Sequence, residues 1–399
     1  MQDVWYKVGV ENKENSKIKD GRKKVFVGLS GGVDSSVALA LLQKEGHDVT
    51  GVFLKGWHPD FLPCDWKEER RSAMRVCATL GVSFMTIDTE AEYKKEVVDY
   101  MIREYSLGRV PNPDIFCNKY VKFGVFLEKA LSMGADYVAT GHYARVESRD
   151  TSDEVREKSN VSSVVSRTSH FVLRESIDTN KDQSYFLYTL NQDQLSRTLF
   201  PIGNMTKPEV RKLAEKFGLP TATKKDSQGL CFLGKVDMKE FLAHFIETKR
   251  GDVLNTQGEV VGYHDGALLY AIGERHGYTI TKKSAHDPRF FVVAKDMDKN
   301  TITVMSKTVF DSGDQNEFDA KEIIIKNFHF ISGKDVQSSL ETTVRIRYRQ
   351  EKQKCVVEKR SDGYYVSFAT PQNGVSIGQS AVFYNGDVCI GGGIIDAIL

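Results

Sequence analysis

The chain has 399 residues, of which 40% are hydrophobic and 27% charged, and its net charge is +1. This is the composition of a globular protein with room for two or three domains, and no apolar run approaches the roughly twenty residues of a membrane span. A net charge near zero does not indicate nucleic-acid binding, so any RNA would have to meet a local basic cluster. Lys207–Lys225 and Arg345–Arg360 are such clusters, although charge alone favours a solvated surface for both.

The N-terminus and the cysteines bear on the compartment. Residues 1–21 lack the apolar core of a signal peptide, and their acidic residues are atypical of a transit peptide, so we expect a polar, flexible tail. The six cysteines include no C-x-x-C pair and no zinc-ligand spacing, which favours reduced thiols and no metal site. Cys77 and Cys389 lie in apolar patterns typical of a core.

The stretch Gly28–Ser36, GLSGGVDSS, stands between a short apolar run and the helical pattern Val37–Leu42. A glycine turn between a strand and a helix points backbone N–H groups at one spot, and that spot attracts a phosphate. The stretch is neither a Walker A loop nor G-x-G-x-x-G. A chance helix cap of serines and glycines is the alternative interpretation.

Strand and helix patterns alternate over residues 22–140. We expect strands at 24–29, 48–54, 82–87 and 136–140, and helices at 34–45, 67–80, 90–107 and 119–133. This alternation predicts an α/β fold with a doubly wound parallel sheet, whose ligands bind beyond the carboxyl ends of the strands. The loops at that edge are 54–66, 108–124 and 140–145. Pro111 and Pro113 stiffen the second loop, which would hold Asp114 and Cys117 three residues apart.

In the second half of the chain, the regular alternation of strand and helix patterns ends. Residues 148–169 read as a flexible insertion, and Thr206 with Glu209 forms a capping box that opens a helix ended by Gly218. A loop over 221–234 carries Cys231, and a short helix follows within 235–247. Short alternating runs then predict a small central domain at 235–300 and an antiparallel β-barrel at 301–399, with runs at 301–305, 343–348 and 364–369 and an Asn-Gly turn at 385–386.

Several motifs together resemble the tRNA-specific 2-thiouridylase family of the PP-loop ATP pyrophosphatase group. They are GLSGGVDSS, GRVPNPDIFCN, ATGHYAR, KDQSYFLY, FPIGNMTKPEVR, DSQGLCFLG, GYHDGALLYAIGERHG, RIRYRQ and IGQSAVFYNGDVCIGGGII. The resemblance implies an adenine nucleotide α-hydrolase-like PP-loop domain at 22–234, a small central domain and a C-terminal β-barrel. It implies sulfur transfer to the wobble uridine of tRNA, with ATP and Mg²⁺.

The resemblance also implies partners, a compartment and site residues. The sulfur would come as a persulfide from a relay that begins at a cysteine desulfurase, and the substrate would be the anticodon loop of Lys-, Glu- or Gln-type tRNAs. A monomer in the bacterial cytoplasm is expected rather than a protein of the mitochondrial matrix. The implied ATP site is Gly28, Leu29, Ser30, Gly31, Gly32, Val33, Asp34, Ser35, Leu54 and Gly141.

By the same resemblance, Cys117 is the nucleophile, Cys231 the persulfide carrier, and Asp114 a catalytic residue beside the target base. The implied tRNA contacts are Asn112, Pro113, Asp114, His142, Lys181, Asp182, Gln183, Arg347, Tyr348 and Gln379. Val110, Glu274 and Ile377 depart from the family pattern, which bears on fine tRNA contacts rather than on the chemistry.

The residues of these motifs are chemically suited to adenylation of a uridine followed by sulfur transfer. A uridine oxygen is a poor leaving group, and adenylation by ATP makes it a good one. A cysteine thiolate is easier to form near positive charge, for which Lys119, Lys122, Lys224 and Lys225 are candidates. Asp114 could act as a general base. The alternative interpretation is that it caps a turn after proline. Two other functions stay open here: a PP-loop ligase or amidotransferase acting on a small metabolite, and a non-catalytic RNA-binding protein.

Overall fold

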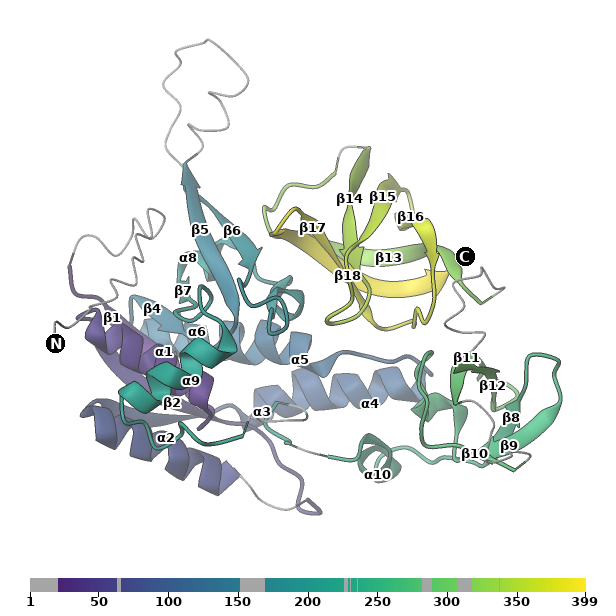
Figure 1. The fold of residues 1–399 in the computed structure, drawn as a ribbon, viewed down its shortest axis with the longest axis horizontal. Helices are drawn as coiled ribbons and strands as arrows, with labels where there is room; N and C mark the ends of the chain where they lie inside the picture. Colours follow the sequence, from purple (N-terminus) through teal and green to yellow (C-terminus); the bar gives the residue numbers. More distant parts are fainter. Residues whose placement is uncertain are drawn as a thin grey trace, which may run out of the picture.

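The computed structural model describes residues 21–62, 66–150, 169–225, 229, 231–234, 236–281, 289–307, 318–336 and 338–399. The tail expected over 1–21, apart from Gly21, lies outside these ranges, as do Cys64 and residues 151–168 of the expected insertion. The described chain forms a parallel sheet with its helices, a small central sheet and a β-barrel (Figure 1). Within the described ranges, no helix has the length and apolar character to cross a bilayer.

The N-terminal unit is built on five parallel strands in the order β3-β2-β1-β4-β7. They are β1 (Lys24–Gly28), β2 (Asp48–Lys55), β3 (Ser83–Asp88), β4 (Tyr137–Ala139) and β7 (Thr198–Leu199). The short apolar runs become strands because both faces of the sheet are covered. The doubly wound sheet predicted from the alternation is therefore confirmed.

Each face of this sheet packs on its own helices. One face meets α1 (Val33–Lys44), α2 (Trp66–Leu80) and α9 (Lys207–Lys216), and Cys77 is buried in that layer. The capping box predicted for α9 is present, since Thr206 N donates to Glu209 Oε2 at 2.7 Å. The opposite face packs on one of two long helices, which packs in turn on the other, and each of these helices has a π-helical segment in its middle.

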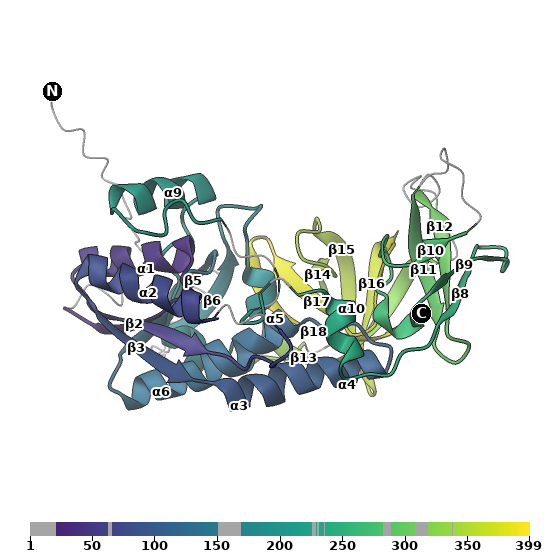
Figure 2. The ribbon, with the colours of Figure 1, turned by 90° about the horizontal axis from the view of Figure 1, so that it is seen from below.

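The first long helix is made of α3 (Glu90–Tyr93), η1 (Lys94–Val98) and α4 (Asp99–Ser106), as predicted for 90–107. It runs from the parallel sheet toward the central sheet (Figure 2). The second is made of α5 (Pro113–Phe116), η2 (Cys117–Val125) and α6 (Phe126–Ser132).

The second long helix corrects the sequence interpretation, which started it at residue 119 and left Asp114 and Cys117 on a loop. The helix begins at Pro113, because proline at the first helical position has a suitable φ and lacks only an N–H that would have no helical partner. Asp114 and Cys117 therefore share a helix, and Cys117 begins its π-helical part.

The central unit is a five-stranded sheet in the order β10-β9-β8-β12-β11. Its elements are α10 (Met238–Ala243), β8 (Gly251–Leu254), β9 (Val260–His264), η4 (Ala267–Leu269), β10 (Thr279–Ile280), β11 (Phe290–Asp296) and β12 (Thr301–Ser306). The strand β12 pairs with β8 and β11, so the central sheet continues past residue 300, where the sequence placed the start of the barrel. An alternating pattern marks a strand but does not say which sheet it joins.

The C-terminal unit is a barrel, closed where β13 (Ala320–Phe330) pairs with β18 (Val388–Ile398). Between them lie β16 (Gly363–Gln372), β15 (Gln353–Arg360), β14 (Ser339–Arg345) and β17 (Ser380–Asn385). The run expected at 343–348 thus ends as a strand at Arg345, while the hairpin expected around Asn385 and Gly386 is confirmed. Closure removes exposed strand edges.

A hairpin joins the barrel to the N-terminal unit. Its strands are β5 (Ala144–Asp150) and β6 (Ser169–Glu175), and β6 pairs with β18. Residues 148–150 and 169 are therefore strand ends rather than part of a flexible insertion. The helices η3 (Ser184–Leu187) and α8 (Gln192–Ser196) follow this hairpin.

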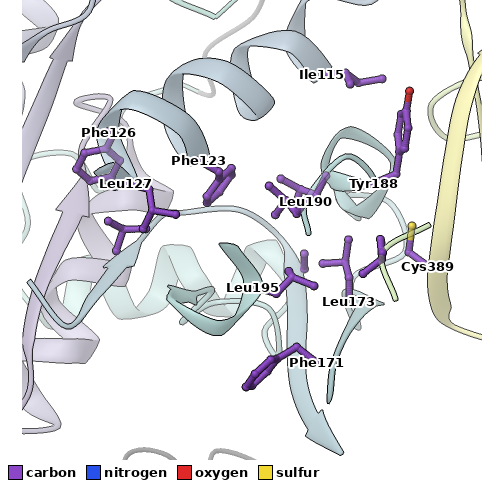
Figure 3. Close-up of a cluster of buried hydrophobic side chains, with 14 of the residues drawn as sticks. Ile115, Phe123, Phe126, Leu127, Phe171, Leu173, Tyr188, Leu190, Leu195 and Cys389 are labelled. Atoms are coloured by element: carbon purple, nitrogen blue, oxygen red, sulfur yellow. The ribbon is translucent and has the colours of Figure 1, made fainter. Parts of the chain in front are cut away.

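The largest of the buried hydrophobic clusters lies at this junction (Figure 3). Ile115 and Phe123 from the Pro113–Ser132 helix belong to the same cluster as Leu173 from β6 and Cys389 from β18. Cys389 is thus a core residue, as predicted. Because these side chains pack together, the helix that carries Asp114 and Cys117 is held from both the sheet and the barrel.

Candidate active site

The glycine loop has the geometry of a phosphate site. Gly32 caps α1 in an extended conformation, and as a glycine it has no side chain that accepts from the first helical turn. The N–H groups of the first helical turn have no intrahelical partner, so they are open to an anion. Gly31 has φ 72°, and a Cβ there would lie 2.5 Å from the backbone oxygen of Glu69. Only glycine fits this turn.

The loop after β4 packs directly against the start of α1. A Cβ on Gly141 would lie 2.7 Å from the carbonyl carbon of Asp34 and closer still to the backbone nitrogen of Ser35. The side chains of Leu29, Val33 and Leu54 are buried, so they line the core rather than an open surface. The glycine loop and Gly141 therefore meet at one edge of the sheet, as the sequence predicted.

Asp34 faces two partners that the sequence did not reveal. Its carboxylate accepts hydrogen bonds from Lys207 Nζ at 2.7 Å and from the hydroxyl of Tyr143 at 2.9 Å. Lys207 belongs to the basic cluster considered for RNA, but here its charge is paired with the glycine loop. No sequence pattern linked Asp34 to Lys207, 173 positions away, or to Tyr143, 109 positions away.

The two cysteines meet although they are far apart in the chain. Cys117 is buried, Cys231 is half-buried, and both are free thiols in hydrogen-bond contact with each other. Asp114 Oδ1 accepts a hydrogen bond from Cys231 N at 3.3 Å, and the Tyr93 hydroxyl donates to Cys231 O at 2.5 Å. The Cys231 backbone is thus held against the helix that begins at Pro113.

A lysine and a histidine complete this cluster. Lys122 Nζ lies 3.5 Å from Cys231 Sγ and 3.4 Å from His142 Nε2, and Thr140 Oγ1 lies 2.7 Å from His142 Nδ1. The hydrogen bond with Cys117, burial and the charge of Asp114 raise the pKa of Cys231, while Lys122 opposes them. Burial and then the charge of Lys122 lower the pKa of His142, so this imidazole is neutral at neutral pH.

Lys224, Phe232 and the residues next to His142 relate this cluster to the glycine loop. Lys224 Nζ donates to the backbone oxygen of Gly31 at 2.9 Å. Phe232, next to Cys231, has φ 67°, which is unusual for a residue with a side chain. Its ring fills the space above Gly56, where a Cβ would lie 2.6 Å from it. The phosphate site and the cysteine pair therefore belong to one edge of the parallel sheet.

Comparison with known proteins identifies the family. Models match residues 23–235 (tRNA methyl transferase HUP domain), 239–306 (tRNA methyl transferase PRC-barrel domain) and 320–395 (Aminomethyltransferase beta-barrel domain). The tRNA-specific 2-thiouridylase MnmA of Pseudomonas savastanoi pv. phaseolicola is 40% identical over 94% of each chain. The chain belongs to the tRNA-specific 2-thiouridylase family.

Other 2-thiouridylases agree. That of Pseudomonas putida is 41% identical over 95% of this chain and 96% of its own, and that of Listeria monocytogenes is 41% identical over 94% and 95%. A solved structure, the U34-tRNA thiolase NcsA of Methanococcus maripaludis, is 15% identical with a TM-score of 0.34 over 58% of this chain and 68% of its own. That likeness is too distant to carry an argument.

The residues that the thiouridylase resemblance assigns to tRNA differ in their surroundings. Asn112 and Pro113 are half-buried at the start of the helix, beside Asp114. Lys181 is half-buried, and the ring of Tyr348 packs 4.5 Å from that of Phe186.

Four others are engaged by protein groups. Asp182 is buried in an ion pair with Arg345 at 2.9 Å, and Gln183 Oε1 accepts from Tyr143 N at 3.0 Å. Gln379 Nε2 donates to Val110 O at 2.7 Å, and Arg347 donates to Ile272 O at 2.5 Å. The contacts of Asp182, Gln379 and Arg347 connect the barrel to the other two units, whereas that of Gln183 lies within the N-terminal unit. A direct role of these residues toward tRNA stays a prediction.

Proposed function

We propose that this protein replaces the 2-oxygen of the wobble uridine of tRNA with sulfur, and that ATP activates the base. The observation that carries the proposal is the contact between the Cys117 and Cys231 thiols at the edge that holds the glycine loop. The curated relatives are named tRNA-specific 2-thiouridylases, and they match nearly the whole chain. A small-metabolite ligase has no use for this cysteine pair.

The first step needs the phosphate site. The 2-oxygen of uridine attacks the α-phosphorus of ATP, and pyrophosphate leaves. The open N–H groups at the start of α1 would hold the departing phosphates. Asp114, at the start of its helix, would act as a general base toward the target uridine. Unpaired anticodon bases suit such a site, because they can be splayed out at low cost.

Magnesium would reach this site with the phosphates of ATP, whose charge it offsets. The described residues include no group of three His, Cys, Asp or Glu side chains that could hold a metal ion. The carboxylate of Asp34 is paired with Lys207. Among the described residues, the protein offers backbone N–H groups for the phosphates but no set of side-chain ligands for a metal ion. The steps proposed for its residues do not require a protein-bound ion.

The second step uses the cysteines. A persulfide on Cys231 presents its terminal sulfur, which attacks C2 of the adenylated uridine, and AMP leaves with the original oxygen. The Cys117 thiolate then attacks Cys231 Sγ, and the electron pair of the broken S–S bond stays with the sulfur on the base. Alternatively, Cys117 attacks the persulfide first and frees sulfide. Both routes end in a Cys117–Cys231 disulfide, for which the thiols are already in contact.

We further propose a sulfur donor, a set of substrate tRNAs, an oligomeric state and a compartment, all of which rest on the family resemblance alone. The sulfur donor is a persulfide-carrying protein, the substrate tRNAs are of the Lys, Glu or Gln type, and the protein acts as a monomer in the bacterial cytoplasm. Cys117 is buried whereas Cys231 is only partly buried, which supports Cys231 as the residue that meets the donor first.

The test is thiolation of an unmodified tRNA transcript with ATP, Mg²⁺ and a sulfur source. Thiolated product is detected by its retardation in a mercury-containing gel, for the wild type and for Cys117→Ser and Cys231→Ser. We expect retardation with the wild type, and its loss in both variants while ATP and tRNA still bind. Retained thiolation by Cys231→Ser would remove the persulfide role. Pyrophosphate release with small metabolites and without tRNA would favour the ligase instead.

A further inference from the structure

We propose that Lys122 is a catalytic residue of the step that loads Cys231 with sulfur, in which its ammonium group stabilises the attacking thiolate. This inference rests on the proposed function and deepens it. Lys122 lies on the same continuous helix as Cys117, in its π-helical part. Its Nζ is 3.5 Å from Cys231 Sγ, so it touches a reacting atom.

The surroundings of Cys231 explain why a cation is needed. The groups that face it are Cys117 and Asp114 from the Pro113–Ser132 helix, Tyr93 from α3 and Lys122 itself. The hydrogen bond with Cys117, burial and the charge of Asp114 all raise the pKa of the Cys231 thiol. Lys122 lowers it, and it is the cation among these groups. The raising effects outweigh Lys122, so the pKa of Cys231 stays above its ordinary value, and loss of Lys122 would raise it further.

The charge of Lys122 is itself maintained by the site. Burial opposes the ammonium form, but the nearby Cys231, Cys117 and Asp114 outweigh it and raise the pKa of Lys122. His142 is neutral, so Nε2 accepts a hydrogen bond from Lys122 and Nδ1–H faces the hydroxyl of Thr140. This tautomer is assigned from the hydrogen-bond partners. The imidazole thus directs the ammonium toward the sulfur without adding a competing charge.

The loading step then balances in atoms and electrons. The Cys231 thiolate attacks the terminal sulfur of a donor persulfide, R–S–SH. A bond forms between Cys231 Sγ and that sulfur, and the donor S–S bond breaks. Its electron pair leaves with R–S⁻, and Cys231 becomes Cys231–S–SH. No external oxidant or reductant is needed, and only the thiolate of Cys231 is nucleophilic enough to begin the transfer.

The test measures the thiol of Cys231 without tRNA or ATP, so its failure differs from a failure of thiolation. Iodoacetamide alkylation of the full-length protein is followed from about pH 6 to about pH 10 by mass spectrometry of the tryptic peptide Asp226–Lys235. All proteins carry Cys117→Ser, so that Cys231 cannot be lost to a disulfide. Lys122→Met is compared with Lys122→Arg and with Lys129→Met, whose Nζ contacts Asp88 O instead of the cysteines.

We expect Lys122→Met to slow alkylation at neutral pH about tenfold and to shift the pH midpoint upward, because one nearby positive charge is lost. Lys122→Arg should restore most of the rate, and Lys129→Met should change nothing. Loading from a small-molecule persulfide should follow the same order. An unchanged midpoint in Lys122→Met would overturn the proposal. So would an equal loss in Lys122→Met and Lys122→Arg, because packing rather than charge would then be the cause.

Discussion

Replacing Asp182 with alanine should destabilise the protein rather than simply weaken tRNA binding. The family resemblance assigns Asp182 to tRNA, yet only 2% of its side chain is exposed. Its carboxylate accepts hydrogen bonds from Ser176 N at 3.0 Å and from Ser184 Oγ at 2.8 Å, and it pairs with Arg345 at 2.9 Å. Asp182→Ala would leave all these buried donors without this acceptor.

The magnitude follows from the partners that remain. Breaking a buried ion pair from one side costs about 3–5 kcal/mol, because the other charge is left without compensation. Arg345 keeps a second partner, Glu175, at 2.9 Å, so we expect the lower end, about 3 kcal/mol. In a unit of 150–250 residues this corresponds to a fall in Tm of roughly 6–12 °C.

The assay is thermal unfolding followed by circular dichroism, with tRNA affinity measured by filter binding well below the transition. Asp298→Ala, a change at an exposed carboxylate, is the control and should stay within about 0.5 kcal/mol of the wild type. If Asp182→Ala kept the wild-type Tm but lost tRNA affinity, a structural role for Asp182 would be refuted. A normal Tm with normal affinity would refute it as well.

Two further changes test the site itself. Gly141→Ala should reduce ATP-dependent pyrophosphate release roughly 10–100-fold, because the new Cβ displaces the start of α1 at Asp34 and Ser35; a normal rate would contradict the packing described for that turn. His142→Gln should reduce the loss of stability on acidification. Burial holds the folded-state pKa of His142 below its unfolded value, so stability is present above about pH 6.5 and is lost as pH falls, by about 1 kcal/mol between about pH 7 and about pH 5.5. Urea unfolding at both pH values measures this, and identical losses in wild type and His142→Gln would contradict a buried neutral imidazole.

The local elements of this protein are largely determined by its sequence. The apolar run before Gly28, the capping box of Thr206 and Glu209, and the Asn385–Gly386 turn each act through neighbours in the chain, so a local pattern suffices to predict them. The glycine loop is of the same kind, since the φ of Gly31 and the open helix cap are local features. The motifs also predict which cysteines carry the chemistry.

Tertiary structure determined which contacts these elements make with distant parts of the chain. That β12 joins the central sheet depends on pairing with β8, and the role of Lys207 depends on Asp34, 173 positions away. The contacts of Lys122 with Cys231 and of Tyr93 with the Cys231 backbone likewise join distant segments. The position of a lysine in the sequence does not reveal whether its ammonium group will contact water, a carboxylate or a thiol. The physical reason is that charge and burial act through space, so a thiol's reactivity follows from the side chains that folding places around it.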